Sequence, residues 1–231
     1  MTSKLSTLSK NSGFHSRNFF QHYFQFNHPT TILIAGPTQA GKTEFVINIL
    51  KNADTLIREP PNKIIWAYGQ KNDRQMDKIA HVSPNVEFIE GFPNLDCIDT
   101  SQNTLLILDD LMDEIGKSAT CANLFTRGSH HLNITVIAII HNLFNQQKHS
   151  RTISLNARYY VLFKSPRDNQ QIRHFGRQIF PSTPSFLPDA LNDACKTPFG
   201  YVVIDLHPMT PDSLRLHSGI FPNEIPRLYI Q

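Results

Sequence analysis

The chain has 231 residues, of which 40% are hydrophobic and 18% are charged, and its formal net charge is +3. This composition is typical of a folded globular protein and excludes a disordered chain, and the length suits one domain with a large core. No apolar run reaches the roughly 18 to 20 residues of a membrane-spanning helix, so no membrane span is expected. The small positive charge permits a nucleic-acid partner but does not establish one.

The N-terminal residues and the cysteines bear on the compartment in which the protein works. Residues 1–13 contain no apolar stretch of the kind that a secretory signal needs. The three cysteines, Cys97, Cys121 and Cys195, have no C-x-x-C spacing, which excludes a zinc ribbon and offers no disulfide framework. We therefore expect an intracellular, reducing compartment.

The start of the chain differs from the rest. Residues 1–28 are polar and contain an aromatic cluster, so we expect a partly flexible N-terminal arm. Within it, Tyr23, Phe24 and Phe26 are expected to pack over a sheet edge. Residues 29–231 are expected to form a single domain.

The first predicted strand, residues 31–35, is a continuous apolar run that leads into a glycine-rich loop. Such a run is typical of a strand buried on both faces, as in a parallel sheet. In the loop spacing G-x-x-x-x-G-K-T, the two glycines let backbone N–H groups converge on phosphates, and the following helix adds its positive N-terminal end. Lys42 is expected to reach the β- and γ-phosphates, and the Thr43 hydroxyl to bind Mg²⁺. The predicted nucleotide-binding residues are Gly36, Pro37, Thr38, Gln39, Ala40, Gly41, Lys42 and Thr43.

A helix follows the loop, and further strands are predicted at residues 63–68, 86–89 and 104–108. The last of these strands ends at two adjacent carboxylates, Asp109 and Asp110, at the edge where α/β sheets bind ligands. Asp109 is expected to hold Mg²⁺ through its water shell, as a Walker B aspartate does. Asp110 is the natural general base, or water-positioning residue, for attack on the γ-phosphate. Two acids after a strand also suit a turn or a helix cap, but their position after a P-loop favours catalysis.

The strand predicted at residues 134–140 delivers a polar pair to the same edge of the sheet. A helix over residues 111–125, weakened by Gly116, is expected to precede it. His141 and Asn142 follow the strand, where a polar group beside the γ-phosphate would report its presence. A capped strand end with an exposed histidine explains the same residues equally well.

The remaining elements complete an α/β pattern. Strands are predicted at residues 159–163 and 200–205, with a helix between them that begins with Ser165 as its N-cap. The proline-rich stretch after residue 205 is expected to be irregular. Alternating strands and helices predict a doubly wound α/β fold, with a mostly parallel sheet and helices on both faces.

Six segments of the chain carry a resemblance to a known family: residues 36–43, 106–110, 125–131, 137–142, 153–158 and 163–167. Together they resemble the FtsK/HerA superfamily, and within it the poxvirus-type DNA-packaging ATPases of large DNA viruses, virophages and Polinton (Maverick) elements. The resemblance implies a P-loop NTPase of the additional-strand, catalytic Glu/Asp type that uses ATP and Mg²⁺. It also implies a homo-oligomeric ring that drives double-stranded DNA into a capsid. The implied partners are therefore DNA of any sequence, further copies of the chain and a capsid component, in the cytoplasm, nucleus or viral factory of a host cell.

The resemblance assigns a further role to Arg127. Family members donate an arginine into the neighbouring subunit's site from the segment before the sensor strand, where it neutralises charge on the γ-phosphate. Arg158 is an alternative donor, and a solvated arginine beside a loop is the simplest other interpretation of Arg127. The candidates for DNA contact are Lys148, Arg151, Lys164, Arg167, Arg173 and Arg177. They would bind phosphates rather than bases, and binding would weaken with salt, although a solvated basic face explains them too.

Two positions depart from the family pattern, and two other functions remain open. His141 stands where the family commonly has Gln, and Asp110 is one methylene shorter than the usual Glu. A switch or loader ATPase would hydrolyse ATP without processive translocation, and slow, DNA-independent turnover would favour it. A nucleoside kinase can also have a Gly-Pro loop that ends in Gly-Lys-Thr, but three scattered cysteines cannot form the usual four-cysteine zinc lobe.

Overall fold

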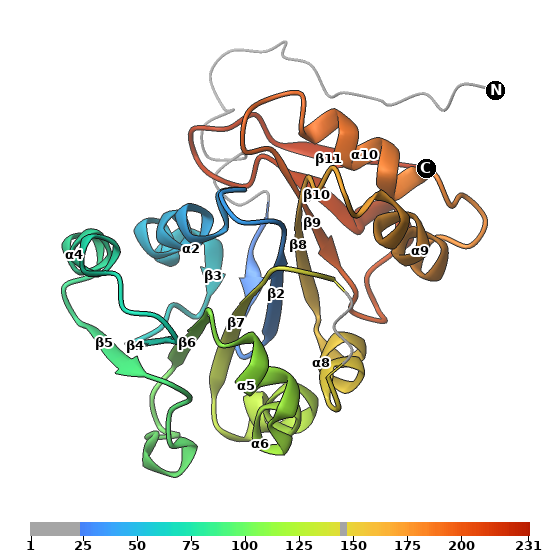
Figure 1. Ribbon diagram of the computed structural model, residues 1–231. Coiled ribbons are helices and arrows are strands. Elements are labelled where there is room, and N and C mark those ends of the chain that lie inside the picture. The colour runs from blue at the N-terminus through green and yellow to red at the C-terminus, as the bar shows by residue number, and fades with distance from the viewer. Residues whose placement is uncertain (1–23, 144–146) are drawn as a thin grey trace.

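The computed structural model describes residues 24–143 and 147–231, and its centre is a nine-stranded sheet (Figure 1). The strands of this sheet are β2 (Thr31–Ala35), β4 (Lys63–Tyr68), β5 (Val86–Glu90), β6 (Thr104–Asp109), β7 (Ile134–Ile140), β8 (Tyr159–Phe163), β9 (Tyr201–Asp205), β10 (Leu216–Ser218) and β11 (Arg227–Tyr229). Their order is β11-β10-β9-β8-β2-β7-β6-β4-β5. The strands from β8 to β5 run parallel, whereas β9, β10 and β11 pair antiparallel. The mostly parallel sheet predicted from the sequence is confirmed.

Strand β7 lies between the P-loop strand β2 and the strand β6 that ends at the carboxylates. This is the additional strand that the resemblance implies. The apolar runs explain why these strands are central: every residue of β2, β7 and β8 is buried. Parallel strands covered on both faces need apolar side chains at every position.

Helices cover both faces of the sheet (Figure 1). On one face lie α2 (Lys42–Lys51), α3 (Ala53–Leu56) and α4 (Asp73–Val82). On the other lie α5 (Met112–Lys117), α6 (Ala119–Asn123), a π-helical turn (Leu124–Gly128), α7 (Ser129–His131), α8 (Ser150–Asn156), α9 (Asn169–Ile179) and α10 (Phe186–Ala194). Strand β2 shows how the two cores form, because side chains alternate along a strand. Ile32 and Ile34 pack in the first core, and Leu33 and Ala35 in the second.

The described part of the predicted N-terminal arm is integrated into the fold. Strand β1 (Phe26–Asn27) pairs in parallel with β3 (Ile57–Arg58). Phe24 and Phe26 are buried, and the Phe26 ring packs edge-on against Tyr159 at 5.0 Å between centroids. Because Tyr159 starts the interior strand β8, the expectation of packing over a sheet edge was wrong for these two rings. Residues 1–23, including Tyr23, lie outside the described residues.

Two expected helices differ from the structure. The helix expected over residues 111–125 is broken at Ser118, whose backbone is extended. The Ser118 hydroxyl caps α6 by accepting a hydrogen bond from the Cys121 N–H. The helix expected from Ser165 begins at Asn169, because Ser165 donates its hydroxyl hydrogen bond to the Asp168 carboxylate (3.1 Å) within the preceding turn. A short hydroxyl or carboxylate side chain favours such local bonds over continued helix.

The C-terminal stretch was expected to be irregular and is not. Strands β10 and β11 extend the sheet by two short antiparallel strands. Each is only three residues long, which is too short for an alternating pattern to be recognised. Within residues 24–143 and 147–231, no helix combines the length and apolar character needed to cross a membrane.

Candidate nucleotide site

A cleft of about 620 Å³ opens at the carboxyl ends of β2, β4, β6 and β7. Ligands bind at this edge in open α/β sheets, and the volume is within the range of about 300–1,000 Å³ for small-molecule sites. The cleft is lined by Thr38, Gln39, Gly41, Lys42, Thr43, Glu44, Gln70, Lys71, Asn72, Gln75, Asp109, Asp110, Ile139, His141 and Phe199. The structure therefore brings the P-loop, both predicted carboxylates and one member of the predicted sensor pair together.

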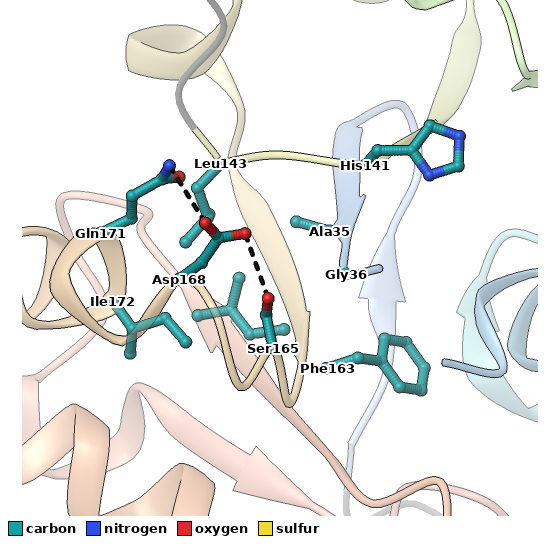
Figure 2. Close-up of a pocket in the computed structure, with 10 residues that line it drawn as sticks. Ala35, Gly36, His141, Leu143, Phe163, Ser165, Asp168, Gln171 and Ile172 are labelled. Carbon is teal, nitrogen blue, oxygen red and sulfur yellow. Dashed lines mark hydrogen bonds between the residues drawn. The ribbon is translucent and has the colours of Figure 1, made fainter. Parts of the chain in front are cut away.

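The two P-loop glycines are needed for different reasons. Gly41 has a φ of 99°, in the left-handed region that favours glycine. Gly36 instead approaches β8, since a Cβ added there would lie 2.8 Å from the Cβ of Phe163. Figure 2 shows Gly36 beside Phe163 on the wall of a cavity of about 10 Å³, which has room for about one water molecule. That cavity is too small for a nucleotide, so the larger cleft is the candidate site.

Helix α2 begins at the loop with its N-terminal N–H groups available to a ligand. Its N-cap is Gly41, and no side chain within the described chain caps it by a hydrogen bond. The first N–H groups of an α-helix have no partner inside the helix, and they carry a partial positive charge. An uncapped helix start of this kind is suited to binding phosphate.

Lys42 is buried inside the loop, where its ammonium group is held by backbone carbonyls. Its Nζ donates hydrogen bonds to the carbonyl oxygens of Gly36 (2.7 Å) and Pro37 (2.8 Å). Burial lowers the pKa of Lys42, and the negative charges of Asp109 and Asp110 oppose this shift. An ammonium group placed close to two carboxylates and an uncapped helix start is well placed to bind a phosphate group.

Asp109 is half-buried at the end of β6, and its carboxylate accepts a hydrogen bond from Gln75 Nε2 of α4 (2.8 Å). Burial raises the pKa of Asp109, and the Gln75 hydrogen bond partly offsets the rise. The donor set fits a hard divalent cation, because Asp109 and the Thr43 hydroxyl supply oxygen atoms to the same cleft. These two residues could hold Mg²⁺ together with phosphate oxygens and water.

Asp110 adopts a left-handed backbone conformation, with a φ of 56°. Aspartate tolerates this region better than most residues, and non-glycine residues in it concentrate at functional sites. The chain is packed tightly here, since a Cβ added to Gly69 would lie 2.2 Å from the Asp110 carbonyl oxygen. The Asp110 side chain is 45% exposed, so solvent water can reach its carboxylate.

His141 and Asn142 follow β7 but lie in different surroundings. The His141 Nδ1 is 3.5 Å from Lys42 Nζ, and its Nε2 is 3.7 Å from Asp110 Oδ1. Asn142 instead lines a separate cavity of about 30 Å³ with residues of α5 and α8. Of the two predicted sensor residues, His141 alone lines the nucleotide cleft.

Arg127 lies at the opposite end of the sheet from the P-loop. It is exposed, in the π-helical turn, and neighbouring residues of that segment line a second cleft of about 300 Å³. That cleft also contains Thr30 and Thr31, where β2 begins. Arg127 is therefore not part of the nucleotide cleft of its own chain. Arg158, the alternative, pairs with Asp205 (3.4 Å) and stacks over Tyr159, so its charge is engaged within the chain.

The predicted DNA-contacting residues are all exposed and are Lys148, Arg151, Lys164, Arg167, Arg173 and Arg177. Two of them, Arg173 and Arg177, lie one helical turn apart on α9, whose Ile172 and Phe175 are buried. The basic pair is therefore on the outer face of the helix. Its contact with DNA stays a prediction.

The strand order and the P-loop together identify the fold. A P-loop joins β2 to α2, and a carboxylate ends a strand that is separated from β2 by one additional strand. The chain has the P-loop ATPase fold. Its sequence matches no protein-family model and no curated protein.

Three solved structures are similar to this P-loop ATPase fold. The DNA-packaging ATPase B204 from Sulfolobus Turreted Icosahedral Virus has 11% identity and a TM-score of 0.48, over 78% of this chain and 94% of B204. The flagellar accessory protein FlaH from Methanocaldococcus jannaschii has 12% identity and a TM-score of 0.44, over 63% of this chain and 76% of FlaH. The third structure is an ATPase domain with 11% identity and a TM-score of 0.39, over 61% of this chain and 70% of that domain. Similarities this remote do not transfer a function to the chain.

The sequence alone missed two kinds of residue in the cleft. Gln70, Lys71 and Gln75 come from the loop after β4 and from α4. The rule that placed Asp109 at a strand's carboxyl end applies equally to Gln70 and Lys71, which closely follow residues 63–68, so the signal for these two was present. Phe199 precedes β9 and had no motif that pointed to the site.

Proposed function

We propose that this chain is an ATP-hydrolysing translocase of double-stranded DNA that packages a viral or virus-like genome into a capsid. The ATPase part is supported by the single cleft in which Lys42, Thr43 and two carboxylates meet. The translocase part is supported by the motif resemblance in residues 125–167. The place of Arg127, outside the cleft of its own chain, suits a ring in which each site is completed by a neighbour.

The triphosphate of ATP would lie on the N–H groups of the P-loop and of the first turn of α2. Lys42 would stay anchored by its two carbonyl partners and direct its charge to the β- and γ-phosphates. A bound Mg²⁺ would supply positive charge that offsets the negative charge of the phosphates. Thr43 and Asp109 are the residues of this chain that would hold the ion.

Asp110 would act as general base for hydrolysis. As the water oxygen attacks the γ-phosphorus, the Asp110 carboxylate takes a water proton. The bond from the γ-phosphorus to the bridging oxygen breaks, and its electrons leave with ADP. His141, which lies between Lys42 and Asp110, would sense whether the γ-phosphate is present, and we assign it this role in preference to Asn142.

The test is phosphate release by the full-length chain, with and without long double-stranded DNA. DNA is expected to stimulate hydrolysis, and Lys42→Ala and Asp109→Ala are each expected to lower the rate by at least about 100-fold. Lys42→Ala removes a positive charge that stabilises the transition state, and Asp109→Ala removes a residue that would hold Mg²⁺. Turnover that DNA does not change would contradict the motor and favour a switch or loader ATPase. Phosphate transfer to a nucleoside would favour a kinase instead.

Mixing variants tests whether Arg127 acts on a neighbouring subunit. Arg127→Ala alone is expected to lose about 10³-fold in rate, as arginine fingers do. A mixture of Lys42→Ala and Arg127→Ala chains is expected to recover part of the activity, since some sites then combine an intact P-loop with an intact arginine. Arg58→Ala, which removes an exposed arginine from β3, is the matched control. Full activity of Arg127→Ala would eliminate the assignment.

A further inference from the structure

Phe199 is an exposed aromatic residue in the wall of the nucleotide cleft. The residue is 71% exposed, and it is the one phenylalanine, tyrosine or tryptophan among the described residues that line the cleft. The other cleft residues are polar, charged or small apart from Ile139. The hydrophobic effect disfavours a phenyl ring in water, so a ligand in the cleft that covered this ring would gain free energy by burying it.

The backbone holds this ring in an unusual conformation. Phe199 has a φ of 59°, in the left-handed region that is a true outlier for a bulky residue and is strained. The flanking chain fixes it there, because the Gly200 N–H donates to the Thr197 carbonyl (3.2 Å). Gly200 is also packed so closely that an added Cβ would lie 2.1 Å from the Ala194 carbonyl oxygen. The backbone therefore holds the start of this side chain at a defined position before β9.

The ring lies against the last turn of the P-loop. A Cβ added to Gly41 would be 3.1 Å from Cδ1 of Phe199 and 3.4 Å from its Cβ. Sheet order places Phe199 on the β8 and β9 flank of β2, whereas Asp109 and Asp110 come from the β7 and β6 flank. A triphosphate whose γ-phosphate faces the carboxylates would thus direct its nucleoside toward the phenyl ring.

We propose that Phe199 is the stacking platform for the base of the bound nucleotide. The inference rests on the proposed function, because it concerns the other end of the same ligand. A flat aromatic base covers exposed apolar area of the ring. Stacking on aromatic side chains is worth a substantial part of nucleotide affinity and does not depend on the base's hydrogen-bonding groups. We therefore expect Phe199 to distinguish nucleotides from inorganic phosphates rather than one purine from another.

The test compares binding of ATP, ADP and inorganic triphosphate to full-length variants by calorimetry. Phe199→Ala is expected to raise the Kd of ATP and of ADP by about 5- to 150-fold and to leave the Kd of inorganic triphosphate within about twofold. Phe199→Tyr, which keeps the ring, is expected to bind all three as the unmodified chain does. Met209→Ala is the matched control, because Met209 is 83% exposed and is not one of the residues that line the cleft.

The outcomes separate this inference from the proposed function. ATP binding that is lost in Lys42→Ala but unchanged in Phe199→Ala would leave the ATPase proposal intact and overturn the stacking platform. Equal weakening of ATP and triphosphate by Phe199→Ala would also overturn it, since the ring would then act only by shaping the P-loop. An unmodified chain that binds neither ATP nor triphosphate would overturn both.

Discussion

The two ends of the sheet hold different kinds of buried polar group. At the carboxyl end, Lys42 and Asp109 are a cation and an acid, and burial shifts the pKa of each in the direction that favours its neutral form. At the amino end, the buried histidine His28 is paired with neutral side chains. The His28 ring is hydrogen-bonded to the Thr135 hydroxyl (2.8 Å) and to the Asn133 carboxamide oxygen (3.0 Å).

This difference separates activity from stability. Charges that are desolvated in an open cleft cost free energy in the absence of a ligand, and active sites commonly retain such a cost. Hydrogen bonds that satisfy buried groups contribute to stability instead. Substitutions of the cleft residues at the carboxyl end should therefore remove activity without unfolding the chain, whereas substitutions of the buried, hydrogen-bonded residues at the amino end should lower stability.

The largest expected effect is on catalysis, from Asp110→Asn. Removal of the general base should lower kcat by about 10²–10⁴-fold. The thermal midpoint should stay within about 1 °C, because the side chain is 45% exposed and exposed substitutions have small effects on stability. Steady-state phosphate release and thermal unfolding of the same sample measure both.

Two further variants test whether the loss of kcat is specific to the Asp110 carboxylate. Asp110→Glu, which restores a carboxylate on a longer side chain, should recover a measurable part of kcat. Asp113→Asn removes an exposed acid in α5 outside the cleft, and should change neither quantity. Normal kcat in Asp110→Asn would assign the base to another group.

The second expected effect is on stability at the amino end, from Thr135→Val. This change removes the partner of the buried His28 ring at nearly constant volume, and should lower the free energy of unfolding by about 1–2 kcal/mol. Thr104→Val is the matched control in the adjacent strand, because the buried Thr104 hydroxyl has no hydrogen-bond partner among the described residues. That variant should be neutral or stabilising. Denaturant titration checks the pair, and equal losses in both would show that the hydroxyl bond to His28 contributes nothing.

The sequence predicted the carboxyl end of the sheet better than the rest. The strand at residues 31–35, the loop to Thr43 and the acids at the end of β6 are local patterns, and one rule about parallel sheets assembles them. His141 and Asn142 could not be separated in this way. Which of two adjacent residues faces a cleft depends on how the chain leaves β7, and no local pattern fixes that direction.

Other features depend on contacts between distant segments. Gln75 reaches Asp109 only because α4 packs beside the P-loop helix. Phe199 reaches Gly41 only because β9 returns antiparallel to β8. Tertiary packing determined both, so the spacing of residues along the chain held no signal for them.

The smallest expected effect is a gain in stability from Asp109→Asn. The same variant should also lose hydrolysis. Burial raises the folded-state pKa of Asp109 above its unfolded value, so the folded chain binds this proton more tightly than the unfolded chain does. The charged form therefore costs stability at neutral pH. Asparagine carries no charge and can still accept the Gln75 hydrogen bond, so the free energy of unfolding and the thermal midpoint should both rise at pH 7.

The pH dependence of this gain identifies its cause. Below the unfolded pKa of aspartate, both states are protonated and the Asp109→Asn variant should match the unmodified chain. As pH rises from the unfolded pKa through the folded pKa of Asp109, the unmodified chain loses stability relative to the variant, and the difference then levels off. Other titrating groups are common to both chains and cancel. A lower thermal midpoint of Asp109→Asn at pH 7 would mean that the attraction between Asp109 and Lys42 outweighs the cost of burial.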